Sequence, residues 1–86
     1  MIVLDRNLNG GTQTVHRFEN GYGASVIRGG TYAYGGLEVG VLKFSGPAPT
    51  DYSLCYDTEI TDDVLGYLSE DEVVEILEQI ENLNGE

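Results

Sequence analysis

The chain has 86 residues, of which 41% are hydrophobic, and its formal net charge at pH 7 is −11. This length and apolar content predict one folded domain with a single modest core, and exclude separate catalytic and binding domains. The excess of acids argues against direct contact with nucleic acid or anionic membranes, and favours cations or basic protein surfaces as partners.

The charge is unevenly distributed along the sequence. Four bases and three acids give residues 1–43 a net charge of +1, whereas residues 44–86 hold twelve acids and no lysine or arginine. The four bases are Arg6, Arg17, Arg28 and Lys43. The C-terminal half is therefore the part expected to attract a basic partner.

Few features point to catalysis or export. The single cysteine, Cys55, excludes an internal disulfide, and no basic residue beside it would lower the pKa of its thiol. Nothing in the sequence places His16 next to Cys55. No secretory signal and no apolar run of the roughly 18–20 residues of a membrane span is found. We expect a cytoplasmic protein with no enzymatic activity and no cofactor.

The N-terminal two thirds read as β-structure. Residues 1–4 form a short apolar strand, and residues 5–11 have turn-forming composition. Asn20-Gly21 separates two β-prone runs and is typical of a two-residue type I′ hairpin turn, which would place Glu19 opposite Tyr22 and Val15 opposite Val26. Further strands are expected over residues 37–44 and 51–57.

A glycine-flanked stretch over residues 29–36 connects two of these strands. It contains Tyr32 and Tyr34, which would lie on the same side if the stretch is extended. Because tyrosine is enriched at binding surfaces, these two are the best tyrosine candidates for contact with a partner.

The last third changes to helical periodicity. Thr61 suits the N-cap of a short helix over residues 62–68, and Ser69 with Glu72 forms a capping-box sequence that opens a second helix. The apolar residues of this second helix recur every three or four positions and are expected to be buried: Val73, Ile76, Leu77, Ile80 and Leu83.

Together these patterns predict a single α+β domain over residues 1–86, β-rich over 1–57 and helical over 61–83. We expect an antiparallel sheet of four or five strands, with two C-terminal helices packed on one face.

The second helix also carries acids on the side away from its apolar residues: Asp71, Glu75, Glu78 and Glu81. Each like-charge pair at this spacing costs about 0.2–0.5 kcal/mol in an isolated helix. Two of the acids also lie at the negative end of the helix dipole, where a cation would be preferred. The face is either a solvated surface that keeps the protein soluble or a surface for a basic partner.

Four earlier acids could add a second row of charge: Asp57, Glu59, Asp62 and Asp63. One helix stripe offers a charge about every 5.4 Å, whereas a DNA strand offers a phosphate about every 3.4 Å. Mimicry of nucleic acid would therefore need both rows. A metal site over the same acids is not predicted, because the segment lacks the glycine and glutamate of a calcium-binding loop.

Two stretches carry a resemblance. The first is NGYGASVIRG followed by YAYGG and LEVGVLKF, and the second is LCYDTEITDDVLGYLSEDEVVEILEQI. Together they resemble short uncharacterised proteins encoded by phages and prophages. The similarity covers roughly residues 17–80. It implies a phage origin and a location in the host cell, and it brings no catalytic residues.

Small acidic phage proteins include inhibitors of host defence, anti-CRISPR proteins among them, and some of those cover a nuclease's nucleic-acid channel with acidic side chains. By this analogy we expect a non-enzymatic protein that binds and inhibits a basic, nucleic-acid-binding host protein, for example a CRISPR effector, by mimicking nucleic acid. The alternative is a phage structural or assembly accessory that self-associates through an unpaired sheet edge. The oligomeric state stays open between a monomer and a small homo-oligomer.

Overall fold

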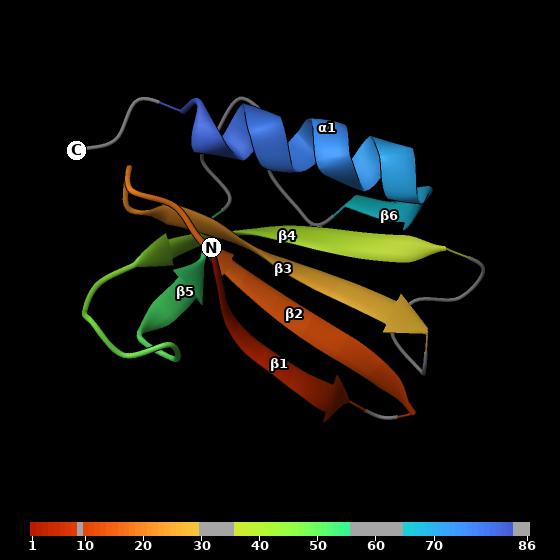
Figure 1. Cartoon of the computed structure of the whole chain (residues 1–86), viewed down its shortest axis with the longest axis horizontal. Helices are drawn as coiled ribbons and strands as arrows, with labels where there is room; N and C mark the ends of the chain where they lie inside the picture. The colour runs from red at the N-terminus through yellow and green to blue at the C-terminus, as the bar shows by residue number, and fades with distance from the viewer. Residues whose placement is uncertain (9, 30–35, 56–64, 84–86) are drawn as a thin grey trace.

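A computed structural model of the protein describes residues 1–8, 10–29, 36–55 and 65–83. These ranges contain six strands and one helix (Figure 1). The strands are β1 (Ile2–Leu8), β2 (Gly11–Arg17), β3 (Tyr22–Gly29), β4 (Leu37–Phe44), β5 (Tyr52–Leu54) and β6 (Leu65–Leu68), and the helix is α1 (Glu70–Glu81). The strands form one antiparallel sheet in the order β1-β2-β3-β4-β5, and β6 also pairs with β4. The expected α+β class is confirmed.

Helix α1 lies across β3 and β4 and buries its apolar side against them (Figure 1). Val73, Ile76 and Ile80 pack in one cluster with two small apolar residues from each of these strands, and Leu77 and Leu83 lie at its margin. The strand members of the cluster are Ala24, Val26, Val39 and Val41. The periodic apolar residues of the C-terminal helix are therefore the main core contact, as the sequence predicts.

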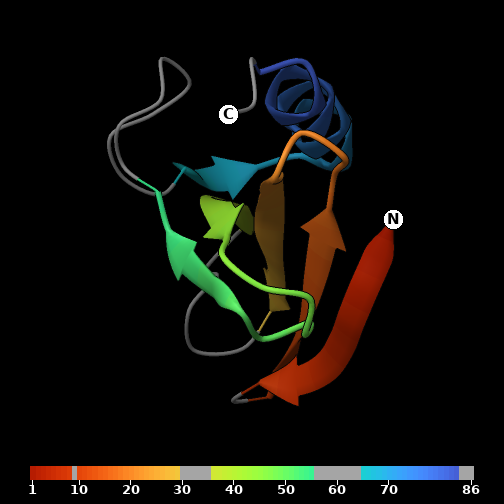
Figure 2. The same cartoon turned by 90° about the vertical axis from the view of Figure 1, so that its left-hand side faces the viewer.

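The opposite face of the sheet holds a second, smaller cluster. Val15, Leu42 and Phe44 are buried there, with Val3, Leu4 and Tyr52 packed against them. Figure 2 shows that the sheet is strongly twisted. Val3 and Leu4 come from β1 and Tyr52 comes from β5, so both outer strands contribute to this cluster. Beside it, Arg6 Nε donates to Gln13 Oε1 at 2.7 Å, and Gln13 Nε2 donates to the buried Ser25 Oγ at 2.8 Å.

The prediction of a helix over residues 62–68 is wrong for residues 65–68, the part that the structure describes. Leu65–Leu68 form strand β6, with Leu68 opposite Leu37 and Leu65 opposite Val39, while residues 62–64 lie outside the described ranges. Within the described part of the chain, β5 pairs with Leu42–Phe44 alone, so the first half of β4 is left with free backbone groups on that side. Strand β6 supplies their partner, and this non-local requirement overrides the local helix signals.

The predicted hairpin register between β2 and β3 is wrong by one residue. Val26 pairs with Thr14 rather than Val15, and the strands are joined by the three-residue loop Glu19, Asn20 and Gly21. Phe18 N donates to Tyr22 O at 2.9 Å, and Gly21 N donates to Phe18 O at 3.3 Å. Only Gly21 has a positive φ, +88°, which is the pattern of a type I turn followed by a left-handed glycine.

Two strand lengths also differ from the prediction. Strand β1 continues to Leu8 instead of ending at Leu4, because residues 5–8 pair with β2 despite their turn-forming composition. Strand β5 covers only Tyr52–Leu54 of the expected 51–57, and residues 56 and 57 lie outside the described ranges.

Candidate partner-binding surface

The outward side of α1 is acidic over its whole length. Its N-terminus is held by a capping box, in which Glu72 N donates to Ser69 Oγ at 3.2 Å and Ser69 N donates to Glu72 Oε1 at 2.9 Å. All four acids expected on the outer face are exposed: Asp71, Glu75, Glu78 and Glu81. We call these four residues the acidic face.

No cation of the described residues pairs with the acidic face. The one ion pair among them joins Arg28 to Glu70, with Nε to Oε2 and Nη2 to Oε1 both at 3.1 Å. The hydrogen bonds from Arg28 lower the pKa of the Glu70 carboxyl, and the same contact raises the pKa of the guanidinium. This bidentate pair ties the end of β3 to the first turn of α1.

The other three bases are engaged elsewhere. The Arg17 guanidinium lies 4.6 Å from the centre of the Phe44 ring, and the Lys43 ammonium lies 4.2 Å from that of Tyr22. Arg6 donates to Gln13. Because every base has a contact away from the outer side of α1, the carboxylates there keep their repulsion uncompensated within the described chain.

The C-terminal end of α1 is bound by the β2–β3 hairpin. Asn20 Nδ2 lies within hydrogen-bonding distance of three carbonyl oxygens, those of Ile80 at 2.9 Å, Glu81 at 3.1 Å and Leu83 at 3.0 Å. Its Oδ1 accepts from Tyr22 N at 3.0 Å. The last turn of α1 contains no basic residue, so a neutral amide is the group that satisfies this negative helix end.

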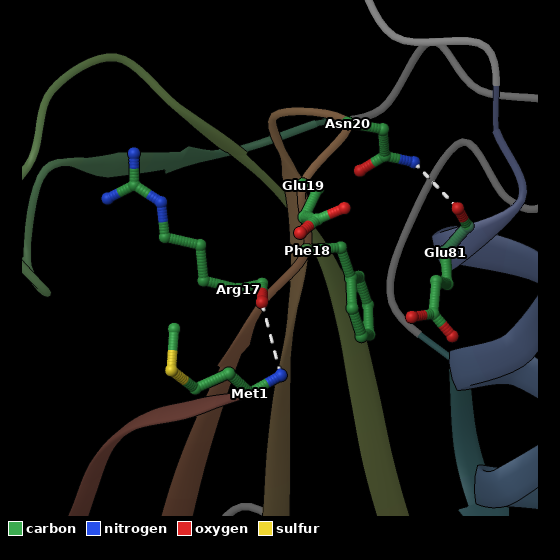
Figure 3. A pocket seen from close by; sticks show the side chains of 6 residues that line it. All are labelled: Met1, Arg17, Phe18, Glu19, Asn20 and Glu81. Atoms are coloured by element: carbon green, nitrogen blue, oxygen red, sulfur yellow. Dashed lines mark hydrogen bonds between the residues drawn. The ribbon is translucent and has the colours of Figure 1, made fainter.

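A surface hollow of about 630 Å³ opens beside this junction (Figure 3). It lies between the start of β1, the hairpin and the end of α1, and its lining residues are Met1, Arg17, Phe18, Glu19, Asn20 and Glu81. The α-amino group of Met1 donates to Arg17 O at 3.2 Å on one side, and Glu81 stands on the other. This hollow could not be predicted from local patterns, since its lining residues lie up to eighty positions apart and Asn20 is typical of a turn.

Six of the ten predicted partner-binding residues lie outside the described ranges: Tyr32, Tyr34, Asp57, Glu59, Asp62 and Asp63. The second acidic row and the tyrosine loop therefore stay predictions. The remaining four, the acidic face, are brought together on one element as expected.

Tyr67 is a surface feature that the sequence did not single out. It is 80% exposed and adopts a φ of +58° within β6, a conformation that costs a non-glycine residue roughly 1–2 kcal/mol. Gly36 lies directly against its backbone, where an added Cβ would come within 2.7 Å of Tyr67 Cα. The positive φ was not predicted, because a helix was expected over residues 62–68 and a helical tyrosine has a negative φ.

His16 and Cys55 do not come together. They lie on or beside β2 and β5, which β3 and β4 separate, so the sheet spacing alone places them roughly 14 Å apart. His16 is half-buried and stacks near Phe18, with 6.4 Å between ring centres. Cys55 packs against the main core, and its backbone N–H donates to Val41 O at 2.8 Å.

Within the described ranges, no group of three or more histidine, cysteine, aspartate or glutamate residues is placed to hold a metal ion. The helix described there is too short and too polar to cross a membrane. Comparison of the chain with protein-family models, with curated proteins and with solved structures gives no match.

Proposed function

We propose that this protein is a non-enzymatic inhibitor that places its acidic face on a basic, nucleic-acid-binding protein. The observation that carries the proposal is the acidic face itself. Four exposed carboxylates share one side of α1, and no described cation contacts them. Such a surface is complementary to a groove lined by lysine and arginine.

The size of the surface supports competition with nucleic acid. From Asp71 to Glu81 the helix rises about 15 Å, which equals the length of about four phosphates along one DNA strand. A charge density like that of DNA would also need the predicted second row, Asp57, Glu59, Asp62 and Asp63. A rigid helix holds the backbone that carries these charges in place before contact. Binding therefore costs little conformational freedom beyond that of the carboxylate side chains themselves. The partner in this proposal is a host protein, such as a nuclease effector, whose nucleic-acid channel the acidic face would block.

The proposal is tested by charge reversal at matched sites. One variant carries Glu75→Lys and Glu78→Lys on the acidic face, and a control carries Asp5→Lys and Glu38→Lys on the sheet. Both change the net charge equally. Each tagged protein is used to capture partners from a bacterial lysate, and captured proteins are then tested for displacement of labelled DNA.

We expect the wild type and the sheet variant to capture the same basic protein and to displace DNA from it, and the acidic-face variant to do neither. Capture should weaken steeply between about 50 and 200 mM salt, as for contacts between phosphates and basic side chains. Equal capture by all three proteins, or capture insensitive to salt, would contradict the proposal.

A second candidate function, self-association as a structural or assembly accessory, is favoured by the free edge of β1. Among the described residues this seven-residue strand pairs with β2 alone, and Ile2 on it is 56% exposed. An unpaired edge of this kind is a template for another strand. Light scattering coupled to gel filtration separates the two functions: a closed oligomer that an Ile2→Lys change dissociates supports self-association, and a monomer opposes it.

A further inference from the structure

We propose that the hollow at the C-terminal end of α1 receives an arginine side chain of the basic partner. The inference rests on the proposed function and adds to it a defined anchoring point at one end of the acidic face. It concerns Phe18, Glu19, Asn20 and Glu81, of which only Glu81 belongs to the acidic face.

The volume of the hollow is sufficient for a long side chain. At about 630 Å³ it exceeds the volume of one side chain, which leaves room for the neighbouring backbone of the partner. Figure 3 shows Phe18 between the start of β1 and the end of α1, with Glu19 and Asn20 above it. Phe18 is half-buried: it packs against the main core and also lines the hollow, to which it adds an aromatic side chain.

The electrostatics of the α1 side favour a cation. The Glu81 and Glu19 carboxylates are exposed there, and the carbonyl end of α1 contributes the negative pole of the helix dipole. Within the chain, the neutral amide of Asn20 donates to this carbonyl end, and the last turn of α1 has no basic residue. A cation supplied by a partner would bring to this helix end the positive charge that the last turn of α1 lacks.

The two positive groups at the hollow stand away from this side. The Met1 α-amino group is bound to Arg17 O, and the Arg17 side chain extends away from Phe18 toward the ring of Phe44 (Figure 3). They would repel a cation from the β1 wall and direct it toward Glu81. A guanidinium fits better than an ammonium, because its planar fork can bind a carboxylate with two hydrogen bonds while it stacks on an aromatic ring.

The test uses the whole protein and a short probe, N-acetyl-Gly-Arg-Gly-amide, followed by ¹⁵N–¹H correlation spectra. Two control peptides replace arginine with citrulline, its neutral isostere, or with lysine. We expect the arginine peptide to shift the amide signals of Phe18, Gly21 and Glu81, the citrulline peptide to leave them unchanged, and the lysine peptide to bind more weakly. Millimolar affinity is sufficient for this readout.

Matched variants test the residues involved. Glu19→Gln with Glu81→Gln should weaken the arginine peptide by about threefold, the effect of losing partly screened ion pairs. Glu75→Gln with Glu78→Gln removes the same charge from outside the hollow and should change the affinity less. Equal shifts with citrulline, equal binding of lysine, shifts spread along the acidic face, or equal effects of the two variants would each overturn the inference.

The lysate experiment separates this inference from the proposed function. If Glu19→Gln with Glu81→Gln leaves capture of the basic partner intact while reversal of Glu75 and Glu78 abolishes it, the hollow is not an anchor and the proposed function stands. If neither change affects capture, both are wrong. Loss of capture with each of the two changes supports both.

Discussion

Asn20 joins the two parts of the fold through a single side chain. Its amide nitrogen satisfies the end of α1 and its oxygen satisfies the backbone of Tyr22. We expect Asn20→Ala to lower the free energy of unfolding by about 1–2 kcal/mol, as for loss of a helix cap. Asn20→Asp should be at least as costly at pH 7, because it turns a carboxylate toward three carbonyl oxygens. Urea denaturation of both variants checks this.

A control for Asn20 comes from the same loop. Glu19→Ala changes a neighbouring exposed residue that has no part in this junction and should leave stability within about 0.5 kcal/mol of the wild type. If Asn20→Asp were as stable as the wild type at pH 7, the contact between the hairpin and the helix end would not carry the stability that we assign to it.

His16 gives the protein a stability that depends on pH. Burial, the N-terminal charge and Arg28 lower the pKa of its imidazole below the ordinary 6.5. The folded state therefore favours the neutral ring. The stability that His16 contributes is full above pH 6.5 and is lost as the pH falls through the lower folded pKa, because the unfolded chain binds the proton first.

The measurement compares wild type with His16→Gln by urea denaturation between pH 7.5 and about pH 5. The difference between the two curves isolates His16 from the many carboxylates, whose protonation both proteins share. We expect the wild type to lose stability relative to the variant as the pH falls. A constant difference, or an imidazole pKa of 6.5 or higher by NMR, would contradict the assignment.

At the scale of the element, α1 carries repelling charges at the expense of its own stability. Four like-charge pairs lie along it at helical spacing, and each costs about 0.2–0.5 kcal/mol. We expect Glu75→Lys with Glu78→Lys to raise the free energy of unfolding by about 1 kcal/mol. Three of the four repulsions and the unfavourable charge near the helix end become attractions, while positions 75 and 78 remain a like-charge pair. A loss of stability would mean that the acids make contacts unlike those described.

This variant separates function from folding. A protein that becomes more stable while it loses its partner shows that the acidic face serves binding. A protein that becomes more stable and keeps every activity shows that the acids serve solubility alone. The Asp5→Lys and Glu38→Lys control reports how much of either effect follows from net charge.

Local patterns predicted α1 well because its signals are local. The capping box, the apolar periodicity and the acidic outer side each depend on residues within a few positions of one another. Strand β6 and the hairpin register could not be read in the same way. Strand β6 exists because β4 has an unpaired half, and the register follows a loop whose Asn20 is held by a helix sixty residues later. The hollow depends on the same long-range contact.

At the scale of the whole molecule, the protein carries a net charge of −11, and its described residues contain one ion pair. Self-repulsion on this scale destabilises the compact state and is screened by salt. We expect the Tm to rise by about 5–10 °C when NaCl increases from about 10 mM to 0.5 M, which corresponds to roughly 1–2 kcal/mol for a domain of this size.

The less negative Glu75→Lys with Glu78→Lys variant should show a smaller rise, and sucrose at a matched concentration separates screening from general exclusion effects. The same screening weakens the attraction to a basic partner, so salt should stabilise this protein while it dissociates the complex. A Tm that falls as salt increases would mean that attractive pairs dominate the charge balance. The acids would then belong to an internal network, and the acidic face would have no surplus charge with which to attract a partner.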